Sequence, residues 1–173
     1  MRVHYEQILA DLDLLAKLAE FRPVVIGTPP LGITVASSDI DVACEAAELN
    51  HFRDRVCAEF QQRPTFAVRS LSIGEQPTCI ANFEYRGWPI EIFCQQIPVQ
   101  RQTGVRHFLI EQRLLRLHPE LRPLIQQARD KGQKTEPAFA QALGLSGDPY
   151  ESLLLLEDLS DEQLAAWIIT NGR

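Results

Sequence analysis

The chain has 173 residues, of which 45% are hydrophobic and 23% are charged, and its formal net charge is −6. This composition is typical of a folded globular protein and argues against a disordered chain. A negative chain offers no broad basic face, so we expect no binding to duplex DNA. The longest purely aliphatic run, residues 153–156, is far too short to cross a bilayer. We therefore expect a cytoplasmic protein that makes no contact with a membrane.

Hydrophobic periodicity predicts the elements of the first half of the chain. Apolar residues three or four positions apart predict an amphipathic helix over residues 4–21, which Pro23 ends. A short buried strand follows at 24–26, and the proline- and glycine-containing segment 28–38 is expected to be a loop. The other elements predicted up to residue 94 are a strand at 40–44, a helix at 48–62, and strands at 65–73, 78–85 and 90–94.

The second half of the chain contains helical patterns alone. The predicted helices cover residues 108–117, 121–131, 136–143, 149–156 and 161–170. We expect an α+β protein with a mixed sheet flanked by helices, followed by an α-helical C-terminal segment. The predicted domains are an α+β core at 1–98 and a helical part at 99–173 that packs on the core.

Four cysteines are present, Cys44, Cys57, Cys79 and Cys94. None of them forms a CxxC pair, and no histidine lies at zinc-ligand spacing from two of them. Three of the four lie in apolar, strand-like runs, so we expect buried free thiols in a reducing compartment.

Two carboxylates open the predicted strand at 40–44. Asp39 and Asp41 are separated by one residue, and strand side chains alternate with period two, so the pair is expected on one face. Adjacent carboxylates repel unless a cation lies between them, and magnesium or manganese suits such oxygen ligands. Gly27 and Thr28 come before this pair, where a glycine turn with exposed N–H groups can bind a phosphate.

Glu91 is a third carboxylate, placed between the apolar residues Ile90 and Ile92. On its own, Glu91 could lie on the solvated face of an edge strand. Beside the aspartate pair, we interpret Glu91 as a third metal ligand or as a general base.

These residues resemble the signature of the nucleotidyltransferase superfamily. That signature begins with a hydrophobic residue, a glycine, and then a glycine or a serine. After a spacer, it ends with two acidic residues on either side of a hydrophobic one. The matching positions are Gly27, Thr28, Gly32, Ser38, Asp39 and Asp41, with Glu91 as the third acid. The resemblance is to the minimal type and implies metal-dependent nucleotidyl transfer. Asp39, Asp41 and Glu91 would be the catalytic and metal-binding residues, and Gly27, Thr28 and Ser38 would contact the nucleotide.

The full length resembles an uncharacterised bacterial family, domain of unknown function 4269. The resemblance rests on motifs at 82–85, 89–93, 106–107, 134–140 and 147–150. The chain departs from the superfamily pattern at Thr28, where serine is usual, and at Pro29 and Pro30, where polar or basic residues often contact phosphate. Arg106 and His107 are then the nearest basic residues expected to neutralise phosphate charge, although they could equally be a solvated helix start.

The function predicted is transfer of a nucleotidyl group from a nucleoside triphosphate to an unknown acceptor, with Mg²⁺ or Mn²⁺ as cofactor. The acceptor could be a small molecule, a protein or an RNA end. Two alternatives use the same residues. One is a non-catalytic, antitoxin-like nucleotide-binding module, and the other is a nucleotide phosphohydrolase.

Overall fold

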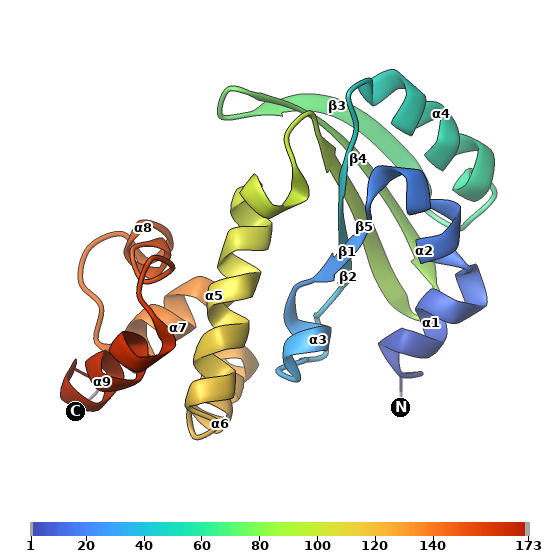
Figure 1. Cartoon of the computed structure of the whole chain (residues 1–173). Helices are drawn as coiled ribbons and strands as arrows, with labels where there is room; N and C mark the ends of the chain where they lie inside the picture. The colour runs from blue at the N-terminus through green and yellow to red at the C-terminus, as the bar shows by residue number, and fades with distance from the viewer. Residues whose placement is uncertain (1, 172–173) are drawn as a thin grey trace. The chain divides into compact units, whose positions relative to one another are not determined.

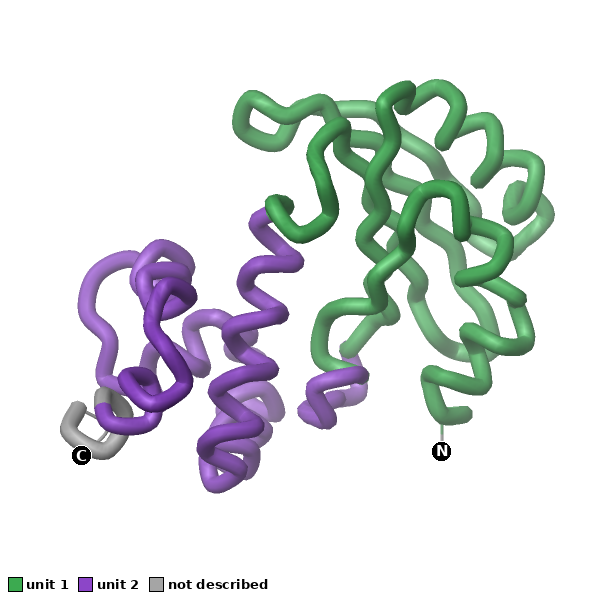
Figure 2. The backbone as a smooth tube through the Cα atoms, viewed as in Figure 1, with its two compact units in different colours: residues 1–29, 38–102 green, residues 30–37, 103–173 purple. Residues whose placement is uncertain are grey.

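The computed structural model describes residues 2–171, which fall into two compact units. The first unit comprises residues 1–29 and 38–102, and the second comprises residues 30–37 and 103–173 (Figure 2). The second unit therefore includes a short segment, 30–37, that lies far from the helical part in sequence. The prediction that residues 99–173 pack on the core stays a prediction.

The first unit is built on a five-stranded mixed sheet (Figure 1). Strands β2 (Ile40–Glu45) and β5 (Trp88–Gln95) pair in parallel, and every other neighbouring pair is antiparallel. The order across the sheet is β1 (Val24–Ile26), β2, β5, β4 (Gln76–Tyr85) and β3 (Ala67–Ile73). Both β2 and β5 are interior strands, so the idea that Glu91 lies on an edge strand is wrong.

Helices α1 (Tyr5–Leu12), α2 (Leu14–Lys17) and α4 (Leu49–Phe60) cover one face of this sheet (Figure 1). Alternate residues of β2 and β5 point into the resulting core, where they pack with helix residues. This core includes Ile8, Leu12, Phe52, Val56, Ile40, Val42, Cys44, Ile90, Ile92 and Cys94. The intervening residues of both strands therefore face the opposite side of the sheet.

The N-terminal helix predicted over residues 4–21 is interrupted. The backbone of Asp13 takes the left-handed conformation (φ 50°), which separates α1 from α2, and a 3₁₀ turn follows at Ala19–Phe21. Aspartate tolerates this conformation better than most residues, so the helical pattern continues in sequence while the backbone turns. The segment expected as a loop also holds a single helical turn, α3 (Thr28–Leu31).

Three of the four cysteines are fully buried free thiols, as the sequence predicts: Cys44, Cys79 and Cys94. Burial raises the pKa of the Cys44 thiol to about 12, so this thiol stays protonated at neutral pH. In the part of the chain that the structure describes, no helix has the length and apolar character that a membrane crossing needs.

From residue 103 on, the described part of the second unit contains five helices: α5 (Thr103–Leu117), α6 (Leu121–Asp130), α7 (Thr135–Leu143), α8 (Pro149–Leu154) and α9 (Asp161–Asn171). Phe139, Leu143 and Leu153 are completely buried. The predicted N-cap Ser160 is confirmed. Its hydroxyl accepts from the Gln163 N–H at 3.1 Å, and its own N–H donates to the Gln163 side chain at 2.9 Å.

Glu111 is a carboxyl group buried inside the second unit. It is 4% exposed, and its Oε1 has no hydrogen-bond partner. Burial, and then the charge of Glu136, raise its pKa well above the ordinary glutamate value, while Arg129 acts in the opposite direction. The folded protein therefore favours the protonated form of this side chain.

We predict that Glu111→Gln stabilises the protein at neutral pH. Because the folded pKa is raised, the parent keeps this side chain's full contribution to stability below the unfolded pKa and loses it as pH rises toward the folded pKa. Glutamine does not titrate, so the difference in unfolding free energy between Glu111→Gln and the parent should be small near pH 4. It should then widen by at most about 1.4 kcal/mol per pH unit. Urea unfolding between pH 4 and 8 measures this gap.

The matched control is Glu84→Gln, which removes an exposed carboxylate from β4. It should leave the pH profile of stability close to that of the parent. Parallel profiles for the parent and Glu111→Gln would contradict a protonated, buried Glu111.

Candidate functional site

The parallel pairing of β2 with β5 places two of the three predicted acids side by side. In the register, Asp41 lies opposite Glu91, with Ile40 opposite Ile90 and Val42 opposite Ile92. Neighbouring strands are about 4.8 Å apart, and paired residues point to the same face. Asp41 and Glu91 therefore share the sheet face that is turned away from the core of the first unit. Both side chains are partly exposed there.

Asp39 is the third predicted acid, and it lies just outside β2, which begins at Ile40. Its side chain is exposed. Asp39 and Asp41 are two positions apart, which in extended chain is a rise of roughly 7 Å. Within the described residues, no group of three or more His, Cys, Asp or Glu side chains is gathered closely enough to hold a metal ion.

Gly27 lies directly against Asp41. It follows β1, which pairs with β2, so that Ile26 is opposite Asp41. The backbone of Gly27 has φ +81°, and a Cβ added there would lie 2.5 Å from Asp41 Oδ2. Both the backbone conformation and the available space therefore require glycine at this position.

The hydroxyl groups of Thr28 and Ser38 are hydrogen-bonded to each other. Thr28 Oγ1 donates to Ser38 Oγ at 2.8 Å, and the two residues are 6% and 1% exposed. Arg2 Nη1 donates to the Ser38 carbonyl at 2.8 Å. These contacts connect the two ends of the segment between β1 and β2. Their participation in nucleotide binding stays a prediction.

Two residues that the sequence did not single out hold the Glu91 carboxylate. Asn82 is opposite Glu91 in β4, and its Nδ2 donates to Glu91 Oε2 at 3.0 Å. Arg69 Nη1 donates to Asn82 Oδ1 at 3.2 Å, and its Nη2 lies 3.8 Å from Glu91 Oε2. The sequence contains Asn82 within a recognisable motif, but the strand register that joins it to Glu91 is visible only in the structure.

Arg106 and His107, the basic residues predicted to bind phosphate, belong to the second unit and have partners within it. The Arg106 guanidinium forms a two-pronged ion pair with the Glu157 carboxylate. This contact holds the pKa of Glu157 below its usual range. His107 is buried, and its Nε2 lies 3.0 Å from the Tyr150 carbonyl oxygen. Their predicted role at the acidic site stays a prediction.

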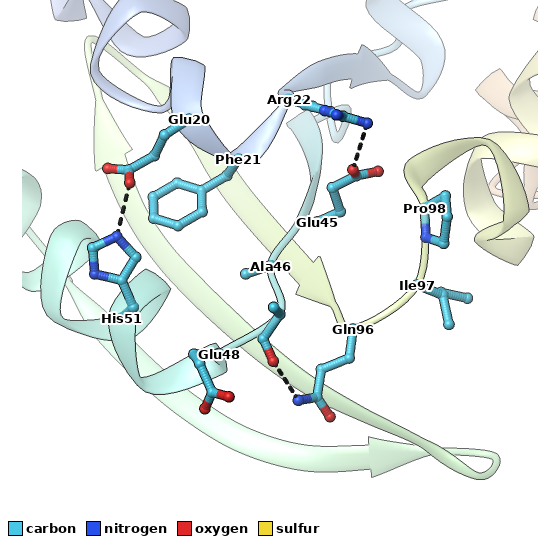
Figure 3. A pocket seen from close by; sticks show the side chains of 11 residues that line it. Glu20, Phe21, Arg22, Glu45, Ala46, Glu48, His51, Gln96, Ile97 and Pro98 are labelled. Carbon is cyan, nitrogen blue, oxygen red and sulfur yellow. Dashed lines mark hydrogen bonds and ion pairs between the residues drawn. The ribbon is translucent and has the colours of Figure 1, made fainter.

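A pocket of about 520 Å³ lies at the opposite ends of β2 and β5, where both strands finish (Figure 3). Four of its charged groups form two ion pairs. Glu20 contacts His51 at 2.8 Å, and Arg22 contacts Glu45 at 3.0 Å. Glu45 is four residues beyond Asp41, a rise of roughly 13 Å along β2. None of the predicted site residues lines this pocket, so cavity volume and acidic chemistry point to different places. The acidic residues are the stronger candidate site, because ion pairs within the pocket already satisfy most of its charges.

Comparison with protein families gives one match. The family model described as Domain of unknown function (DUF4269) matches residues 7–156. That range includes β1 to β5 and every residue predicted for the site. A search of curated proteins gave no match.

Comparison with solved structures gives members of the RNA uridylyltransferases. The Cid1 poly(U) polymerase with MgGTP bound has a TM-score of 0.55 and 15% identity, over 88% of this chain and 49% of that chain. A cytoplasmic RNA terminal U-transferase has a TM-score of 0.54 and 16% identity, over 88% of this chain and 47% of that chain. Cid1 with its short product ApU has a TM-score of 0.55 and 15% identity, over 88% of this chain and 48% of that chain. This chain spans about half the length of these proteins and shares their nucleotidyltransferase fold.

We predict that Gly27→Ala destabilises the protein more than Gly87→Ala. The two glycines have the same φ of +81°, but a Cβ at Gly87 meets nothing within 4 Å, whereas a Cβ at Gly27 meets the Asp41 carboxylate. The backbone strain is shared, so the contact with Asp41 should account for an excess of about 1–3 kcal/mol. Chemical denaturation of both variants measures the excess.

A double-mutant cycle identifies the source of this excess. In an Asp41→Ala background the clashing carboxylate is gone, so Gly27→Ala should cost no more than Gly87→Ala. Equal costs for the two glycine variants in the parent background would contradict the close approach of Gly27 to Asp41.

Proposed function

Since this chain belongs to the family described as Domain of unknown function (DUF4269) and has the nucleotidyltransferase fold, we propose that it is a metal-dependent nucleotidyltransferase. The reaction transfers a nucleotidyl group from a nucleoside triphosphate to an acceptor. Asp39, Asp41 and Glu91 are the proposed metal-binding and catalytic residues.

The observation that carries this proposal is the placement of Asp41 beside Glu91, with the backbone of Gly27 against Asp41. Two carboxylates on neighbouring parallel strands share one partly exposed face. Two neighbouring negative charges repel each other, so such a pair attracts a divalent cation. The glycine turn provides a place where phosphate oxygens can approach backbone N–H groups.

The donor set fits a hard divalent cation. Carboxylate oxygens are the ligands that Mg²⁺ and Mn²⁺ prefer, and Mg²⁺ completes its shell with water and substrate phosphate. Asp41 and Glu91 would hold the ion, with Asp39 contributing from the segment just before β2. When bound, the ion would supply Lewis-acid stabilisation of charge on the transferred phosphate.

The protein's own residues would bind and orient the reactants. The attacking hydroxyl oxygen of the acceptor forms a bond to the α-phosphorus, and the bond from that phosphorus to the pyrophosphate leaving group breaks. Glu91 would either complete the set of metal ligands or accept the proton of the hydroxyl. Asn82 holds Oε2 of Glu91, which leaves Oε1 without a hydrogen-bond partner within the described part of the chain.

A non-catalytic nucleotide-binding module is the second candidate, and it is favoured by the turn after β1. The Thr28 hydroxyl is buried against Ser38, and Pro29 and Pro30 follow in place of basic residues. Such a turn has fewer donors for a triphosphate than a serine-rich turn. The two candidates differ in whether pyrophosphate is released.

We predict that Mg²⁺ strengthens binding of a nucleoside triphosphate to the parent chain and that Asp41→Asn or Glu91→Gln removes this increment. Loss of one carboxylate ligand should weaken metal-dependent binding by about 1–3 kcal/mol, because it leaves fewer anionic oxygens for the cation. Calorimetric titration with Mg²⁺ and with EDTA measures the increment. Glu84→Gln, an exposed carboxylate on β4, should keep it.

Product analysis then separates the functions. Pyrophosphate together with a labelled acceptor supports nucleotidyl transfer, whereas inorganic phosphate alone indicates a phosphohydrolase. Binding without either product supports the non-catalytic module. An increment that survives in both carboxylate variants would contradict the proposed site.

A further inference from the structure

We propose that Arg69 binds a phosphate group of the acceptor, so that the acceptor is a phosphate-bearing molecule with a free hydroxyl. This inference rests on the proposed function, because it assigns the acceptor side of the same site. Arg69 lies on β3, and none of the features that point to the acidic residues points to it. The structure joins it to Glu91 through Asn82.

Three side chains form a continuous polar row on one face of the sheet. Arg69 is in register with Ile80, and its guanidinium reaches diagonally to Oδ1 of Asn82. Because Oδ1 accepts from Arg69, the amide of Asn82 is fixed with Nδ2 toward Glu91. Arg69 therefore sets the orientation of the amide that holds Glu91.

The guanidinium of Arg69 keeps donors available for a ligand. Its side chain is 59% exposed, and its contacts are one hydrogen bond to Asn82 and a 3.8 Å approach to Glu91. A guanidinium has five N–H donors in a planar fork that matches phosphate oxygens. The remaining donors of Arg69 can thus engage a phosphate beside Glu91 without releasing Asn82.

The strand order assigns the two sides of the site. Gly27 follows β1 and approaches Asp41 from one side, whereas β3 lies on the other side, beyond β5 and β4. If the triphosphate occupies the Gly27 side, the attacking hydroxyl must approach from the Glu91 side, where its proton is accepted. Arg69 is a cation on that side, so we assign it to the acceptor and not to the triphosphate.

The surroundings of Arg69 suit an acceptor with an apolar part as well as a charge. Leu71 and Ile73 follow Arg69 at alternate positions of β3 and lie on the same face of the strand. They are 40% and 46% exposed. A nucleotide, with a phosphate and a flat base, matches one cation beside two exposed aliphatic side chains.

The experiment measures acceptor binding to the full chain, with Mg²⁺ and a nucleotide analogue whose α,β bridge cannot be cleaved. The probes are a short single-stranded RNA with a free 3′ hydroxyl, adenosine 5′-monophosphate and uncharged adenosine. The variants are Arg69→Ala, Arg69→Lys and the control Arg22→Ala, which removes an exposed arginine paired with Glu45. Binding of the triphosphate analogue to each variant is measured in parallel.

We expect Arg69→Ala to weaken binding of a phosphate-bearing probe about tenfold, and to weaken binding of the triphosphate analogue less than that. The slope of log affinity against log salt for RNA should fall by about 0.7, the amount expected for one lost phosphate contact. Arg69→Lys should keep this salt slope, and Arg22→Ala should match the parent. An effect on RNA alone identifies a strand end as the acceptor, and an effect on both phosphate probes identifies a small phosphorylated acceptor.

Unchanged binding of both phosphate probes in Arg69→Ala would overturn the inference, as would failure of the parent to bind either probe. Equal losses in Arg69→Ala and Arg22→Ala would also overturn it, because they would indicate a general charge effect. Transfer by the parent to an uncharged molecule or to a protein would reject the phosphate-bearing acceptor while leaving the proposed reaction intact. If the parent chain shows no metal-dependent nucleotide binding, the proposed reaction itself would be rejected.

Discussion

The parallel pairing of β2 with β5 is the constraint on which the candidate site depends. It sets Asp41 opposite Glu91, although the two are fifty positions apart in the chain. The apolar residues between these acids anchor both strands in the core beneath α1 and α4. Because a shift of one residue would move the acids to the core face, the burial of Ile40, Ile90 and their neighbours fixes the acids on the other face.

The same sheet organises the groups that contact the acids. On one side of the pair, Gly27 follows β1 and lies against Asp41. On the other side, β4 and β3 deliver Asn82 and Arg69 to Glu91. A binding site arranged in this way uses the rigid interior of a sheet for its carboxylates and the flanking strands for groups that contact reactants. This arrangement is the physical basis for assigning nucleotide and acceptor to different sides of the acids.

Much of this unit could be predicted from the sequence, because alternation and turn residues are local signals. The strands containing Asp41 and Glu91, the glycine turn and the helical second half all follow from such patterns. The break at Asp13 could not be predicted, since the helical pattern continues across it. Strand order and register are non-local, so the partnership of Glu91 with Asn82 and Arg69 was missed. The partners of Arg106 and His107 were missed for the same reason.

The most direct test of the account is a crystal structure of the chain with Mn²⁺ and a non-cleavable nucleoside triphosphate analogue, using the anomalous signal of manganese. The account predicts an anomalous peak at coordinating distance from one carboxylate oxygen of Asp41 and one of Glu91, with phosphate oxygens completing the shell. A manganese ion or a nucleotide in the pocket beside Glu20 and His51, with the two acids unoccupied, would contradict it.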